Sequence, residues 1–198
     1  MKRTLWMMVL VSSLALAAGT LQDAQTQYTG GDFKEAAETA AGLNTAPGWT
    51  LAAKANSIYA STQPTAKQEP LYVTSEKYAR TAVKLDEKNS DGYFEIARAL
   101  GRLSQLRGVL AALTQGLGNQ IRDNLEKSLK YDAQNASAMV AYGLWHAEIV
   151  GKGVAFLYGA DSARGIKYFQ RAIEIEPKVI IHRVEFARGM TLIDKKSI

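Results

Sequence analysis

The chain has no cysteine and only two histidines among its 198 residues. Without cysteine, no disulfide framework, thiolate nucleophile or thiolate metal ligand is available, so packing alone must hold the fold together. The histidines, His146 and His182, are far apart in the sequence and belong to no cluster of potential metal ligands. His146 falls in an apolar helical stripe, which predicts a buried structural histidine. The sequence therefore predicts no catalytic centre, no metal site and no cofactor.

A large excess of charge of one sign is also missing. The formal charge is +5 for the whole chain, and it falls to +3 without the N-terminal Lys2 and Arg3. The basic residues are spread along the chain and form no polybasic arm, so nothing favours a nucleic-acid partner. No run of alternating apolar residues bounded by turn residues predicts a β-strand.

The longest apolar run lies at the N-terminus. Lys2 and Arg3 precede an apolar stretch at 5–16, and small residues follow it. This order is typical of a secretory signal peptide, and the run is shorter than the ~20 residues that a membrane-spanning helix needs. We expect residues 1–19 to be cleaved, after Ala17 or after Gly19. The mature chain, 20–198, is then a single domain of the periplasm or the extracellular space, with no membrane anchor left.

One sequence pattern occurs three times: residues that predict a helix, then an acidic or proline-containing turn, then residues that predict a second helix. The copies cover 78–100, 125–146 and 168–190, and the equivalent residues Ala82, Ser128 and Ala172 are 46 and 44 positions apart. Within a copy, apolar residues recur at i, i+3, i+4 and i+7, which is the spacing of a buried helical stripe. Such stripes are formed by Tyr93, Ile96, Ala97 and Leu100, and by Met139, Tyr142, Gly143 and His146.

These stripes resemble the tetratricopeptide repeat (TPR), in which a large residue, a small residue and an aromatic residue recur at set positions. Gly143 matches the small position outright, and Phe169, Ala172 and Pro177 fit the second half of the repeat. The resemblance implies an all-α, TPR-like α-solenoid of three to four stacked antiparallel helix pairs, with a C-terminal capping helix. Solenoids of this kind bind other molecules and seldom carry chemistry.

The period is longer than the ~34 residues of a standard repeat. We expect the extra residues between the two helices of a pair. In the first insertion Leu103, Leu106, Leu110, Leu113 and Leu117 continue the helical spacing, and the second insertion, 150–160, is apolar and rich in glycine. Long pairs with apolar insertions resemble the regulator of microtubule dynamics family and its bacterial relatives, over 121–129, 143–145 and 168–172.

Outside the copies, the sequence predicts helices at 20–29, 32–44 and 47–60, with Asp32 capping the second. A loop containing Pro64 and Pro70 should precede a helix at 71–85. The final helix, 179–193, has no partner behind it. Either its outer face is polar and caps the array, as Arg183 suggests, or a partner subunit covers it.

Residues beside the core stripe of each first helix should face the inside of the superhelix, because i, i+4 and i+8 share a face. Arginines on this face are suited to bind carboxylates or phosphates of a ligand. The alternative is that they pair with Glu95, Glu148 or Glu185 within the array. The predicted concave wall consists of Phe94, Arg98, Arg102, Val140, Leu144, Glu148, Val184, Arg188 and Leu192.

Two functions follow from this wall. The first is an adaptor of the cell envelope that binds a protein partner through its concave face. The alternative is a carrier of a lipid or another amphipathic anion, a ligand class that the family resemblance also implies. The apolar insertions at 109–113 and 154–158 either extend the core or line a groove, because both are too apolar to stay in water.

Overall fold

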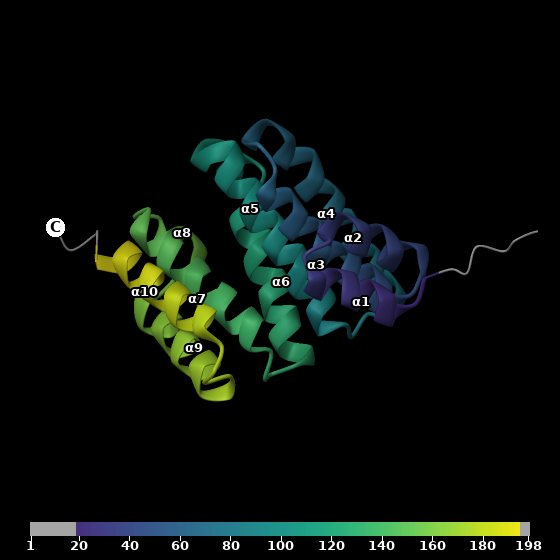
Figure 1. The fold of residues 1–198 in the computed structure, drawn as a ribbon. Coiled ribbons are helices and arrows are strands. Elements are labelled where there is room, and N and C mark those ends of the chain that lie inside the picture. The colour runs from purple at the N-terminus through teal and green to yellow at the C-terminus, as the bar shows by residue number, and fades with distance from the viewer. Residues whose placement is uncertain (1–18, 195–198) are drawn as a thin grey trace, which may run out of the picture.

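The computed structural model describes residues 19–194, which are helical nearly throughout and contain no β-strand. The predicted signal peptide lies outside the described residues, except for Gly19. Consecutive helices pack as antiparallel pairs, and the pairs stack side by side into a solenoid (Figure 1). The helices are α1 (Leu21–Gly30), α2 (Phe33–Gly42), α3 (Ala46–Thr62), α4 (Thr65–Leu85), α5 (Ser90–Thr114), α6 (Leu117–Tyr131), α7 (Ala136–Gly151), α8 (Ala155–Tyr158), α9 (Ser162–Ile175) and α10 (Ile180–Asp194).

The predicted all-α solenoid is confirmed. Here α1, α3, α5 and α7 are the first helices of their pairs, α2, α4, α6 and α9 are the second helices, and α10 stands alone at the end. Each copy of the repeated sequence pattern therefore covers the second helix of one pair, a turn, and the first helix of the next pair. The two insertions lie between first and second helices, at the end of α5 and around α8.

An asparagine cap repeats at two turns of the array. Asn89 accepts a hydrogen bond from the Gly92 amide at 2.8 Å, and Asn135 accepts one from the Ala138 amide at 2.9 Å. Each cap also reaches back to the preceding first helix. The amide of Asn89 donates to Thr50 Oγ1 at 2.8 Å, and that of Asn135 donates to Asp91 Oδ1 at 2.9 Å. One side chain thus begins a helix and ties it to its neighbour.

Glycine permits close helix contacts around Phe169 of α9, which is fully buried. A Cβ atom at Gly143 of α7 would lie 2.8 Å from the Phe169 ring, and one at Gly189 of α10 would lie 2.7 Å from it. These distances are shorter than a carbon contact allows. Phe169 therefore occupies space that both glycines leave free, which confirms the small-residue position expected at Gly143.

Three local expectations were wrong. Helix α4 begins at Thr65 and includes Pro70, where we expected a loop. Pro70 is the sixth residue of the helix and has no amide N–H, so α4 continues through it without one backbone hydrogen bond. Asp32 occupies the cap position of α2 without a side-chain hydrogen bond. The leucine stripe of the first insertion is interrupted at Gly108, whose φ of 81° is non-helical. As a result, Leu103 is buried, while Leu110 is 77 % exposed.

The end of the array is also less polar than expected. Helix α10 packs against α7 and α9 through buried His182 and Gly189. Its outer surface exposes Ile180 at 73 % and Val184 at 53 %. The expected C-terminal capping helix is confirmed, but its outer surface combines these apolar side chains with exposed Arg183 and Thr191 and is not uniformly polar.

Candidate binding groove

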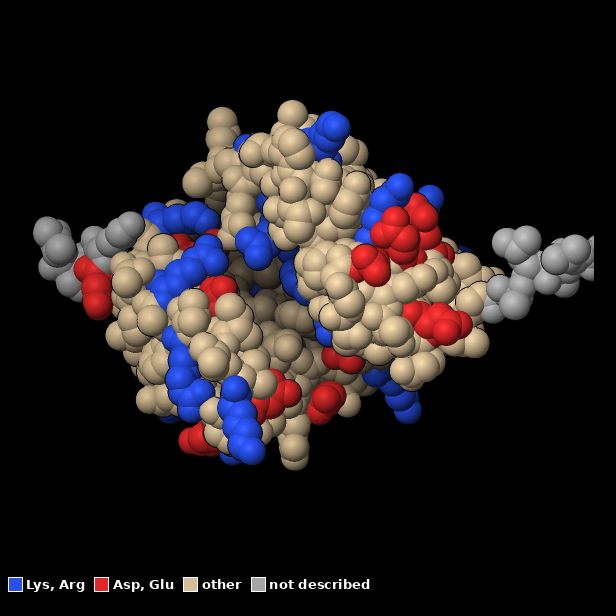
Figure 2. All heavy atoms as spheres, in the orientation of Figure 1, with Lys and Arg blue, Asp and Glu red and all other residues tan. Residues whose placement is uncertain are grey.

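A groove of about 330 Å³ lies on the inner side of the array, where α5, α7 and α10 face one another. Figure 2 shows it as a hollow ringed by blue side chains, with red close beside it. Residues of α6 contribute to its depth. The groove runs across three successive repeats, so the stacking of repeats creates it.

The floor of the groove is apolar and includes two large aromatic side chains, Phe94 and Trp145. Trp145 is held in place because its indole Nε1 donates to the Gly118 carbonyl at 2.9 Å. At Gly101 the floor is open, since a Cβ atom there would meet no atom within 4 Å. The other floor residues are Ala97, Ile121, Leu125, Val140, Ala141 and Leu144.

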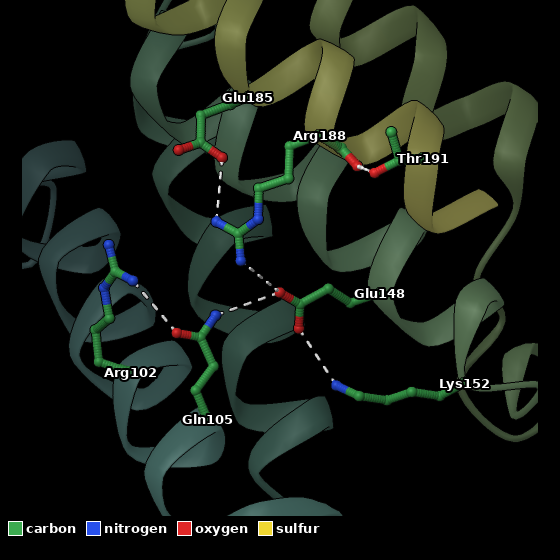
Figure 3. A network of polar contacts seen from close by, with 7 residues as sticks. All are labelled: Arg102, Gln105, Glu148, Lys152, Glu185, Arg188 and Thr191. Atoms are coloured by element: carbon green, nitrogen blue, oxygen red, sulfur yellow. Dashed lines mark hydrogen bonds and ion pairs between the residues drawn. The ribbon is translucent and has the colours of Figure 1, made fainter. Parts of the chain in front are cut away.

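The rim carries a chain of polar contacts that links the three helices (Figure 3). Arg188 of α10 pairs with Glu185 at 3.3 Å and with Glu148 of α7 at 3.8 Å. Gln105 of α5 donates to Glu148 at 3.3 Å and accepts from Arg102, also at 3.3 Å. Among the described residues, Arg102 pairs with no carboxylate, whereas Arg188 pairs with two.

A second ion pair lies next to the groove. Glu95 is 2 % exposed and pairs with Arg98, which also donates to the Lys54 carbonyl at 3.0 Å. Burial raises the pKa of Glu95 to about 7, because desolvation outweighs the attraction of Arg98 and Lys54. Arg98 faces the groove, but its charge is already directed toward a buried carboxyl. It is therefore a weaker site for an incoming anion than Arg102.

The structure brings most of the predicted wall residues together. The groove is lined by Phe94, Arg98, Arg102, Val140, Leu144, Glu148 and Arg188. Val184 and Leu192 do not line it, because α10 is rotated relative to the expected register and presents Ile181, Glu185 and Arg188 instead. The expectation that arginines pair with Glu95, Glu148 or Glu185 is correct for Arg98 and Arg188.

The predicted wall did not include twelve of the nineteen residues that line the groove, among them Gly101, Gln105 and Ile181. Gly101 follows directly after the apolar stripe of α5, and a glycine in the middle of a long helix is an unusual choice because it weakens the helix. That signal was present in the sequence. The contact of Gln105 with Glu148, 43 residues away, had no local signal.

Both histidines are buried, and His182 also lines the groove. His146 is fully buried, and its Nδ1 accepts from the Asp161 amide at 3.1 Å, which positions the start of α9. Burial lowers the pKa of His146 to about 4, and Arg164 adds to this effect, so the ring is neutral near neutral pH. His182 contacts Glu176 Oε2 at 2.6 Å, a carboxylate partner that we had not expected.

Two further observations concern metal ligands and membrane-spanning helices in residues 19–194. No group of three or more potential ligands among His, Cys, Asp and Glu is placed to hold a metal ion. No described helix combines the length and apolarity needed to cross a bilayer.

Stacked helix pairs with an inner groove define a TPR-like helical repeat protein. The family model for regulator of microtubule dynamics protein 1-3 matches residues 13–196, so the chain belongs to the regulator of microtubule dynamics family. Among solved structures, the chain is similar to a thermophilic TPR protein in Thermus thermophilus. The TM-score is 0.61 at 12% identity, covering 86% of this chain and 79% of that one. No curated protein gave a significant match. Both resemblances drawn from the sequence are confirmed.

Proposed function

We propose that this protein is a non-catalytic adaptor of the cell envelope that binds a segment of a partner protein in the groove. TPR-like folds are suited to protein interaction, because the inner faces of successive repeats form one continuous surface. The observation that supports this use is the combination of an apolar floor, open at Gly101, with a polar rim where Arg102 has no carboxylate partner among the described residues.

The preferred ligand follows from the charges on the rim. Arg98 and Arg188 are paired with Glu95, Glu148 and Glu185. An acidic group on the ligand therefore meets Arg102 most readily, while an apolar side chain beside it fills the floor at Gly101. We expect a short segment that carries an acidic residue next to an apolar anchor.

The test is to select peptides from a displayed random library and to measure their affinity calorimetrically. Gly101→Leu should weaken binding by about tenfold or more, because the new side chain fills the floor. The same change should leave the fold intact or stabilise it by about 0.5–1 kcal/mol, since leucine favours a helix more than glycine does. Gly42→Leu, at a helical glycine outside the groove with equally open surroundings, is the matched control.

The charge preference is tested at Arg102. Arg102→Glu should weaken acidic peptides by roughly fivefold and favour basic ones. Arg171→Glu, on exposed α9 away from the groove, should change neither. The adaptor proposal fails if no peptide is enriched, or if the selected peptides bind Gly101→Leu as well as the parent.

A second candidate is a carrier of an amphipathic anion such as a lipid. It is favoured by the volume of about 330 Å³, which falls within the range of small-molecule pockets, and by the apolar floor beneath a cationic rim. Native mass spectrometry of gently purified protein should then show a bound amphiphile that Gly101→Leu displaces. A mass equal to that of the chain alone would contradict the carrier function without affecting the adaptor proposal.

The envelope location rests on the N-terminal sequence. Expression with the native N-terminus should release a mature chain. Its intact mass should correspond to an N-terminus at Ala18 or at Thr20. A chain that stays in the cytoplasm and begins at residue 1 or 2 would overturn this part of the proposal.

A further inference from the structure

The two insertions expose large apolar side chains instead of burying them. In the tail of α5, Val109 is 51 % exposed and Leu110 is 77 % exposed; in α8, Phe156 is 82 % exposed and Leu157 is 60 % exposed. We had expected these insertions to extend the core or to line a groove. The four side chains do neither.

Other apolar residues of the same insertions are packed inward, so the outward ones are not needed for the core. Val154 and Tyr158 pack against the core, and the Tyr158 ring lies over Gly118, where a Cβ atom would come within 2.7 Å of it. Leu106 and Ala112 pack inward in the same way from α5. Arg122 also donates to the Tyr158 carbonyl at 3.4 Å. The insertions are thus anchored, with a separate apolar set facing outward.

Both insertions lie on one edge of the array. Since successive helices are antiparallel, every connection from a first helix to a second helix is at the same edge. We call this the insertion edge and define it by residues 31–32, 63–67, 107–119 and 151–161. The connections from second to first helices, 43–45, 86–91, 132–135 and 176–179, form the opposite turn edge. In Figure 1 the tail of α5 and α8 lie toward the upper side and the α6–α7 and α9–α10 turns toward the lower side.

The two edges differ in charge. The insertion edge carries three basic residues, Lys67, Arg107 and Lys152, and two acidic residues, Asp32 and Asp161. Arg107 and Lys152 pair with Glu69 and Glu148, which lie on the adjoining helices. The turn edge carries two lysines and five acidic residues, Asp86, Glu87, Asp91, Asp132 and Glu176. In Figure 2 the uppermost part of the molecule is tan and blue without red.

We propose that the insertion edge docks on the surface of an anionic lipid bilayer, with Leu110 and Phe156 entering the interface between head groups and acyl chains. Apolar side chains combined with cationic charge are what such an interface attracts, and the acidic turn edge would be repelled from it. A protein partner fits less well, because none of the four exposed side chains lines the groove between α5, α7 and α10. The proposal is independent of the groove and of what the groove binds.

Fluorescent labelling at single sites tests this contact directly. The chain has no cysteine, so one cysteine can be introduced at a time and labelled with an environment-sensitive dye. The sites are Leu110→Cys and Phe156→Cys, with Ile180→Cys as the matched control. Ile180 is 73 % exposed, nearly the same as Leu110, but it lies on α10 away from the insertion edge.

The probe is a phosphatidylcholine vesicle containing about 30% phosphatidylglycerol, compared with phosphatidylcholine alone. We expect the dye at 110 and 156 to brighten on the anionic vesicles and to be quenched by spin-labelled lipid, while the dye at 180 does neither. No response at 110 and 156, or an equal response at 180, would overturn the proposal.

Vesicle co-sedimentation provides the second measurement. Leu110→Ser with Phe156→Ser should lower the bound fraction of protein by about tenfold or more, because two apolar side chains no longer leave water. Ile180→Ser with Val184→Ser should leave it unchanged. All variants share one N-terminus, checked by intact mass, so the N-terminal segment cannot cause a difference. Gly101→Leu should bind vesicles like the parent, which separates a failure of this proposal from a failure of the groove.

Discussion

Glu95→Gln should make the stability of this protein less dependent on pH. Glu95 is buried beside Arg98, and its pKa is raised from 4.5 to about 7 in the folded protein. The folded state therefore binds this proton more tightly than the unfolded chain does. The resulting stabilisation is present below the unfolded pKa and is lost as pH rises toward and past the folded pKa.

The size of the effect follows from the two pKa values. A difference of two to three units corresponds to about 3 kcal/mol in all, and on the order of 2–3 kcal/mol of it falls between about pH 5 and about pH 8. Glutamine keeps the shape of the side chain and an acceptor for Arg98 but has no proton to lose. The free energy of unfolding of Glu95→Gln, relative to the parent, should therefore increase by this amount over the interval.

Denaturant unfolding of both proteins at a series of pH values measures this difference. The comparison is needed because His146 acts in the opposite direction, with a pKa lowered from 6.5 to about 4. Gln134→Ala, at an exposed side chain with no titratable proton, is the control and should show a constant difference. A Glu95→Gln difference that is also constant with pH would refute the reasoning.

Three further predictions concern the packing and the caps. Gly143→Ala should lower the free energy of unfolding by about 1–3 kcal/mol, because the new methyl group would overlap the Phe169 ring; Gly42→Ala, with open space around it, should not. Asn135→Ala should cost about 1–2 kcal/mol in the same assay, since it removes a helix cap and the contact with Asp91; Asn119→Ala, at an exposed site, is its control. His146→Gln should reduce the loss of stability as pH falls from about 6.5 toward 4, because the folded protein disfavours the charged imidazole. If the free energy of unfolding of His146→Gln falls between about pH 6.5 and about pH 4 as steeply as that of the parent, this last prediction is contradicted.

The helix pairs could be predicted from the sequence because their signals are local. The apolar stripe at Met139, Tyr142 and His146 has helical spacing, and the turn at 132–135 marks where one helix ends and the next begins. The resemblance to the TPR pattern then predicted that the helix pairs stack into a solenoid. Gly143 at the small position was sufficient to predict a close contact, although the residue that fills it, Phe169, became certain only in the structure.

The rotation of single helices could not be predicted in the same way. In α10, Val184 and Leu192 were as plausible for the groove as Ile181 and Glu185. The choice depended on how Gly189 packs against Phe169 and on the contact of His182 with Glu176. These contacts join different helices, so no periodicity within α10 reports them.

By itself, the sequence determined the class of this protein, its repeat and seven of the nineteen residues that line its groove, because helical periodicity and repeat spacing are properties of short stretches of chain. Only the tertiary structure decided which charges remain available and which apolar residues are exposed. Arg98 and Arg188 are paired while Arg102 has no carboxylate partner among the described residues, and Leu110 points outward after the break at Gly108. Pairing and exposure depend on side chains from several helices, and these come together only when the repeats stack.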